Sequence, residues 1–120
     1  VIDILVDETD PSNLSFEADT YWAAEAGVDV FGFLKRLKGR IKLYHINDRG
    51  TKLSKAPITP LLKSDSMELG YGNMPLKELL DIVLAENVDA VVLESHKNWP
   101  DNSPIRSLEM SAEFMNKYVK

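Results

Sequence analysis

The chain has 120 residues, of which 44% are hydrophobic and 28% charged, with a formal net charge of −5 and no cysteine. This size fits one domain at most, and the lack of cysteine excludes disulfides and thiolate metal sites. The acidic balance argues against nucleic acid and anionic membranes as partners. No apolar run reaches the roughly 18 residues of a membrane span, and the acidic start is unlike a signal peptide. We therefore expect a cytoplasmic protein, and the missing initiator Met predicts a single partial domain over residues 1–120.

The predicted elements alternate between strands and helices along the chain. The sequence predicts a helix end at 1–6, strands at 14–19, 40–46 and 88–96, and helices at 21–27, 30–39, 75–87 and from Pro104 onward. Residues 47–74 are predicted to form one long polar loop. Strands that alternate with helices pair in parallel, and their continuous apolar character indicates that both faces are covered.

A doubly wound sheet and a (β/α)8 barrel both fit this pattern. A complete barrel needs about 250 residues. Three strand–helix units in 120 residues are therefore only part of such a barrel.

Each predicted strand ends in side chains that bind metals or move protons. They are Glu17 and Asp19 on the first strand, His45 and then Asp48 on the second, and Glu94 and then His96 on the third. Because the carboxyl ends of parallel strands meet at one edge, we expect these groups to lie together. One Asp, one His and one Glu form a mixed oxygen and nitrogen set that suits Mn²⁺, Mg²⁺, Co²⁺ or Zn²⁺ without choosing among them.

Each of these residues also has a purely structural explanation. Asp19 could serve only as a helix N-cap, and His45 could be a hydrogen-bonded structural residue. Glu94 follows the apolar run "AVVL", so if buried it must be paired, protonated or coordinated. The recurrence of such a residue at the end of all three strands favours a common site.

Four stretches together resemble the sugar phosphate isomerase/epimerase family, whose members have a xylose isomerase-like TIM barrel. They are "FEADTYWAAEAGVDV", "RIKLYHINDRG", "ELGYGNMPLKELL" and "VVLESH". The resemblance extends from about residue 11 to the C-terminus, and the order and spacing of the stretches are more specific than any one of them. It implies that the chain is the C-terminal part of such a barrel.

The resemblance also implies a mechanism. One divalent metal is held by Glu, Asp, His and Glu from four strands, and Asp19, His45 and Glu94 match the last three. Glu94 matches one of two carboxylates that transfer a proton next to the carbonyl of a sugar or sugar phosphate, through an enediolate. Asp48 matches an Asp of the family's H-x-K-D stretch, and we expect it to orient His45 or to hydrogen-bond near it. Glu17 shares a strand face with Asp19, and we expect it to have the same kind of supporting role.

Two departures from the family pattern concern the completeness of the site. The first Glu ligand has no counterpart in the chain, so we expect an incomplete ligand set and little activity from this chain alone. Trp22 occupies a position that is His in many members, and we expect it to form an apolar wall for the sugar. Arg49 and His96 are also predicted to contact the substrate.

Two other functions and one association remain open at the sequence level. The related AP-endonuclease branch of the same barrel superfamily is a metal-dependent phosphodiesterase with several metals and extra histidines; two histidines and a charge of −5 argue against it. A non-catalytic binding or assembly module would keep the acids only for capping. In either case, a partial barrel exposes unpaired edges, so we expect self-association.

Overall fold

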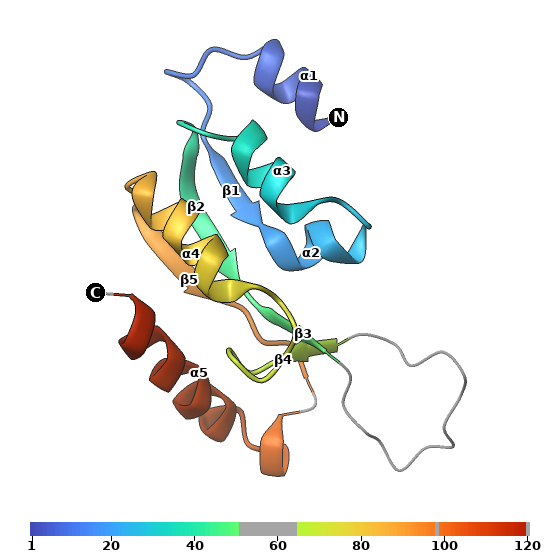
Figure 1. The fold of residues 1–120 in the computed structure, drawn as a ribbon, viewed down its shortest axis with the longest axis vertical. Coiled ribbons are helices and arrows are strands. Elements are labelled where there is room, and N and C mark those ends of the chain that lie inside the picture. The colour runs from blue at the N-terminus through green and yellow to red at the C-terminus, as the bar shows by residue number, and fades with distance from the viewer. Residues whose placement is uncertain (51–64, 98, 120) are drawn as a thin grey trace.

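The computed structural model describes residues 1–50, 65–97 and 99–119 of the chain (Figure 1). The helices are α1 Ile2–Asp7, α2 Thr20–Glu25, α3 Val30–Arg36, α4 Leu76–Ala85 and α5 Pro104–Tyr118, with a short 3-10 helix at Pro100–Asn102. The strands are β1 Phe16–Asp19, β2 Ile41–Ile46, β3 Asp48–Gly50, β4 Asp65–Met67 and β5 Ala90–Leu93. None of the helices described is long and apolar enough to cross a bilayer.

The three longer strands form one parallel sheet in the order β1–β2–β5, as predicted. Asp19 of β1 lies opposite His45 of β2, and Ile46 of β2 lies opposite Leu93 of β5. Helices connect consecutive strands of the sheet, as parallel pairing requires (Figure 1). The predicted α/β fold with three parallel strand–helix units is confirmed.

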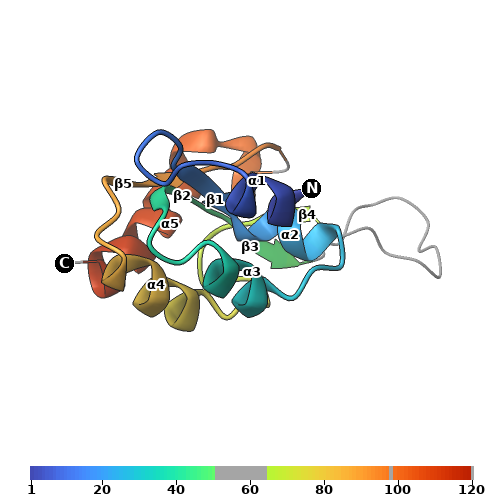
Figure 2. The ribbon, with the colours of Figure 1, turned by 90° about the horizontal axis from the view of Figure 1, so that it is seen from above.

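The apolar core lies between this sheet and helices α3 and α4. Figure 2 shows both helices on the same side of the strands. Ala18, Tyr44 and Ile46 point from the sheet toward them, and Leu34 and Leu79 point back; each is at most 1% exposed. Because successive strand residues alternate between faces, the neighbours of these core residues, Glu17, Asp19 and His45, point to the opposite face.

The prediction of one continuous loop over residues 47–74 is wrong in part. β3 and β4 pair antiparallel there, with Arg49 opposite Ser66. Each strand has only three residues, and "DRG" and "DSM" show neither the β-branched content nor the alternation that predicts a strand. Residues 51–64 of the predicted loop lie outside the described residues.

Arg40 ties the start of the chain to the sheet. It is only 7% exposed, and its guanidinium donates hydrogen bonds to the carbonyls of Val6 and Leu14 and to the hydroxyl of Thr9. It also lies over the ring of Phe16, 4.9 Å from the centroid. These contacts hold α1 and the following turn against the beginning of β1 and β2.

Candidate metal centre

His45 lies at the centre of a group of carboxylates at the carboxyl end of the sheet. Its Nε2 is 2.9 Å from Oε1 of Glu17, and its Nδ1 is 3.4 Å from Oδ2 of Asp19 and 3.7 Å from Oε2 of Glu94. The His45 side chain is 26% exposed, so the group is open to solvent on one side. Glu17 occupies one ring nitrogen, which directs the other toward Asp19 and Glu94.

Strand register explains why these residues meet. Glu17 and Asp19 are two apart on β1 and share a face, and Asp19 lies opposite His45 on β2. β5 ends at Leu93, opposite Ile46, so Glu94 follows at the same edge. Asp19, His45 and Glu94 each offer one ligand atom, and these atoms all lie within 4.8 Å of one another. The predicted convergence of the three strand ends is present in the structure.

Asp19 caps a helix with one carboxylate oxygen and turns the other toward His45. Its Oδ1 accepts a hydrogen bond from the backbone N–H of Trp22 at 2.9 Å and so caps α2. Its Oδ2 is the atom that faces His45. The cap orients the carboxylate, and because capping uses only one oxygen, the other oxygen remains available to a cation.

Oε2 of Glu94 receives three contacts. The side-chain Nδ2 of Asn47 donates a hydrogen bond to it at 3.0 Å, Nε2 of His96 is 3.4 Å away, and Nδ1 of His45 completes the set. The sequence analysis missed Asn47. The available signal was a polar residue directly after the apolar end of β2, but its position suited a turn equally well.

Among the described residues, the carboxylate of Asp48 accepts hydrogen bonds from backbone N–H groups and makes no contact with His45. It is 1% exposed, and its carboxylate accepts backbone N–H groups from Arg49 and from residues 70, 72 and 74 at 2.8–3.0 Å. A Cβ on Gly72 would collide with this carboxylate, which explains the glycine there. Asp48 therefore folds the 70–74 segment against β3, and its predicted support of His45 has no contact in the described residues.

Of the three residues predicted to contact substrate, His96 contacts Glu94 directly, Trp22 packs against His96, and Arg49 pairs elsewhere. Trp22 is 52% exposed, and its ring packs edge-on against that of His96, with centroids 5.8 Å apart. Tyr21 lies edge-on to Trp22, with ring centroids 5.0 Å apart, and its ring is 6.5 Å from that of His96, so the three rings form one cluster. The guanidinium of Arg49 pairs with Glu25 of α2. These positions leave the substrate contacts a prediction.

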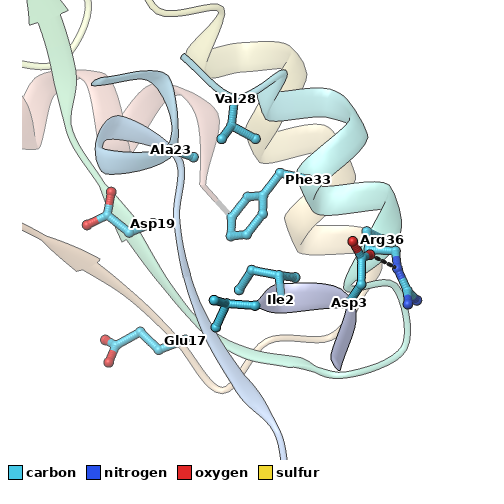
Figure 3. Close-up of a pocket in the computed structure, with 9 residues that line it drawn as sticks. Ile2, Asp3, Glu17, Asp19, Ala23, Val28, Phe33 and Arg36 are labelled. Atoms are coloured by element: carbon cyan, nitrogen blue, oxygen red, sulfur yellow. Dashed lines mark hydrogen bonds and ion pairs between the residues drawn. The ribbon is translucent and has the colours of Figure 1, made fainter. Parts of the chain in front are cut away.

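A pocket of about 560 Å³ lies along the edge strand β1. It is lined by Glu17 and Asp19 together with side chains of α1, α2 and α3. In Figure 3 the two carboxylates project from one side of β1, while Ile2 and Phe33 lie across the strand from them. An ion pair between Arg36 and Asp3, at 2.8 Å, lies at the far end (Figure 3). The ligand group is therefore beside this pocket and not at its apolar end.

The donor set fits a divalent cation. Two donors that each lie about 2.1 Å from one ion are about 3.0–3.4 Å apart at octahedral or tetrahedral angles. Nδ1 of His45 is 3.4 Å from Asp19 and 3.7 Å from Glu94, close to these distances, and the three ligand atoms all lie within 4.8 Å of one another. Two carboxylates and one imidazole do not select one metal among Mn²⁺, Mg²⁺, Co²⁺ and Zn²⁺.

Two solved structures share this fold. Both are sugar phosphate isomerase/epimerase crystal structures from Parabacteroides distasonis ATCC 8503, with TM-scores of 0.70 and 0.71 and sequence identities of 20% and 23%. Each match covers 98% of this chain but only 36% and 37% of the solved chains, so this chain spans about a third of their length. No family model and no curated protein matches the chain. At these identities the likeness establishes an α/β fold that corresponds to part of a barrel.

Proposed function

We propose that this chain carries part of the site of a divalent-metal-dependent sugar or sugar phosphate isomerase/epimerase. The observation that supports this most strongly is the meeting of Asp19, His45 and Glu94 at the ends of three neighbouring strands. The sequence resemblance implies the same three residues as ligands. The likeness of fold to two sugar phosphate isomerase/epimerase structures agrees with that assignment.

The residues of the chain divide the chemistry among them. A divalent cation, when bound, polarises a substrate carbonyl and stabilises the oxyanion that develops there. Glu94 takes the proton from the carbon next to that carbonyl, which produces an enediolate, and a proton returned to a different atom or face completes isomerisation or epimerisation. Glu17 fixes the ring orientation of His45 through its 2.9 Å contact with Nε2.

The surrounding side chains suit a small polar substrate. Trp22 and His96 form an aromatic wall next to the carboxylates, and the wall limits access of water to the reacting carbons. Arg49 lies on β3, and its guanidinium is a group that can bind hydroxyl or phosphate oxygens. We propose these three residues as substrate contacts.

The proposed site contains three of the four ligands that the resemblance implies. A set with one ligand fewer binds metal more weakly and positions substrate less well. We therefore propose weak metal binding and little catalysis by this chain alone.

Metal titration tests the proposal directly. Binding of Mn²⁺ or Co²⁺ is measured by calorimetry on the chain and on His45→Ala and Glu94→Ala, with Glu109→Ala as the control. Glu109 is a 60% exposed carboxylate that pairs with Arg106 on α5. We expect both site substitutions to weaken binding strongly and the control to leave it unchanged. Absence of binding, or binding that neither site substitution affects, would contradict the proposal and favour a non-catalytic module.

A further inference from the structure

The side-chain amide of Asn47 is fully buried and has a single hydrogen-bond partner among the described residues. Asn47 follows the last residue of β2, and it is 0% exposed. Nδ2 donates to Oε2 of Glu94 at 3.0 Å. Oδ1 is buried and has no hydrogen-bond partner among the described residues. Within the part of the chain that the structure describes, the one hydrogen bond of this amide is therefore with a candidate metal ligand.

This arrangement does not serve stability. Burying an amide is unfavourable unless its hydrogen bonds are made, and an unpaired buried carbonyl oxygen adds to that penalty. A leucine of similar size at residue 47 would bury apolar surface without either penalty. Glu94 does not need the bond for its own solvation, because its side chain is 28% exposed and water can reach it. Residues that break the rule of satisfied core groups are expected where function requires them.

The bond determines where one oxygen of Glu94 lies. Glu94 follows the end of β5, and its flexible side chain would otherwise sample several rotamers. The oxygen held by Asn47 is the same oxygen that lies 3.7 Å from Nδ1 of His45 and 3.4 Å from Nε2 of His96. Asn47 lies between β2 and β3 and is fully buried, so its amide can hold that oxygen toward the site.

We propose that Asn47 is a positioning residue that holds Oε2 of Glu94 at the metal-ligand position before a metal binds. This inference rests on the proposed function, because it assigns Glu94 as a ligand. It adds a residue of this chain that neither the strand-end pattern nor the sequence resemblance identified. Preorganisation of this kind strengthens metal binding by removing the cost of ordering the ligand.

The first test separates positioning from a structural role. Asn47→Leu and Asn47→Ala are compared with the unsubstituted chain in Mn²⁺ affinity, by calorimetry, and in unfolding midpoint, by denaturant titration. We expect Mn²⁺ affinity to fall about 10- to 100-fold in both variants, while the midpoint of Asn47→Leu stays equal or rises. A merely structural role would lower the midpoint and leave the affinity of the folded protein unchanged, which would overturn the inference. Asn47→Ala provides the result if leucine does not fit.

Ser66→Ala is the matched control. Ser66 is 3% exposed, and its Oγ is also buried without a partner among the described residues. It lies on the neighbouring hairpin and makes no bond to Glu94. We expect its substitution to leave Mn²⁺ affinity unchanged, so that loss of affinity is specific to the amide that contacts Glu94.

A second test needs no metal and separates the inference from the proposed function. Crystal structures of the metal-free chain and of Asn47→Ala are compared at Glu94. We expect the Glu94 carboxylate to turn away from His45 once the amide is gone, and an unchanged Oε2 position would overturn the inference. If the unsubstituted chain binds no Mn²⁺, the proposed function fails, and this structural comparison alone decides whether Asn47 positions Glu94.

Discussion

One face of the parallel sheet is packed into the core and the other carries the candidate site, and two neighbouring residues of β2 show this contrast. Tyr44 is 0% exposed beneath the helices, and its hydroxyl bonds Oγ1 of Thr20 at 2.7 Å. His45 points the other way, is partly exposed, and is surrounded by Glu17, Asp19 and Glu94. Strand alternation assigns one residue to the core and the next to the candidate site.

The contrast indicates that stability and chemistry are separable in this chain. The helix-covered face buries closely packed apolar side chains such as Leu79 and Ile46. The other face carries acids and also leaves Val92 38% exposed. Substitutions on the covered face should therefore change stability, and those on the open face should change binding or association.

Leu79→Ala should give the largest loss of stability. Leu79 is 0% exposed within the core, and removing a buried leucine side chain costs about 2–5 kcal/mol. We expect this loss in the free energy of unfolding from denaturant titration, with unchanged Mn²⁺ affinity of the protein that remains folded. Ile4→Ala, at a residue 65% exposed, is the control and should change stability little. Equal losses in both variants would contradict the assigned core.

Alkaline pH should destabilise the fold through Tyr44. Burial raises the pKa of Tyr44 to about 12, whereas the pKa of a tyrosine in an unfolded chain is about 10. As pH rises through this window, the unfolded state loses a proton that the folded state keeps, so stability falls, by about 3 kcal/mol at most. The free energy of unfolding measured from about pH 9 to about pH 12 checks this.

Tyr44→Phe provides the control for the pH effect. It should lose the hydrogen bond to Thr20, which costs about 1 kcal/mol near neutral pH. In exchange it should lack the part of the alkaline decline that Tyr44 causes. Tyr71→Phe, at a residue 56% exposed, should keep that decline. The same slope in Tyr44→Phe and in the unsubstituted chain would show that Tyr44 does not contribute.

His45→Ala should reverse the pattern of Leu79→Ala. The His45 contacts are partly exposed, so we expect a stability change of about 1 kcal/mol or less at neutral pH. Mn²⁺ affinity should fall about 100-fold or more, because a direct ligand is lost and ligands matter at least as much as their supporting groups. Calorimetry and denaturant titration on the same samples measure both. Large destabilisation with retained affinity would break the separation of the two faces.

Val92→Lys should have the smallest effect on stability and the clearest effect on association. We expect a change in unfolding free energy of about 0.5 kcal/mol or less, because Val92 is partly exposed. We propose that the open face and the edges of the sheet mediate self-association, so the charge should weaken it in size-exclusion chromatography with light scattering. Ile105→Lys, at an exposed residue of α5, is the control. A monodisperse monomer of the unsubstituted chain would contradict the proposal.

The sequence by itself determined the α/β fold class and the meeting of Asp19, His45 and Glu94 at one edge of the sheet. Strand patterns that alternate with amphipathic helices predict parallel strands, because parallel pairing needs helical crossovers. Asp19, His45 and Glu94 each lie within one residue of the carboxyl end of such a strand, and parallel strand ends meet at one edge. Local pattern and general topology were therefore sufficient for these conclusions.

Only the tertiary structure decided the contacts of Asn47 and Asp48. Both are polar residues after a strand, where a turn is the ordinary expectation. Asn47 donates a hydrogen bond to Glu94, which is 47 positions away in the sequence. Asp48 accepts a hydrogen bond from the backbone N–H of Met74, which is 26 positions away. Pairings over such separations depend on how β3, β4 and β5 come together in space, and the identity of neighbouring residues does not encode that.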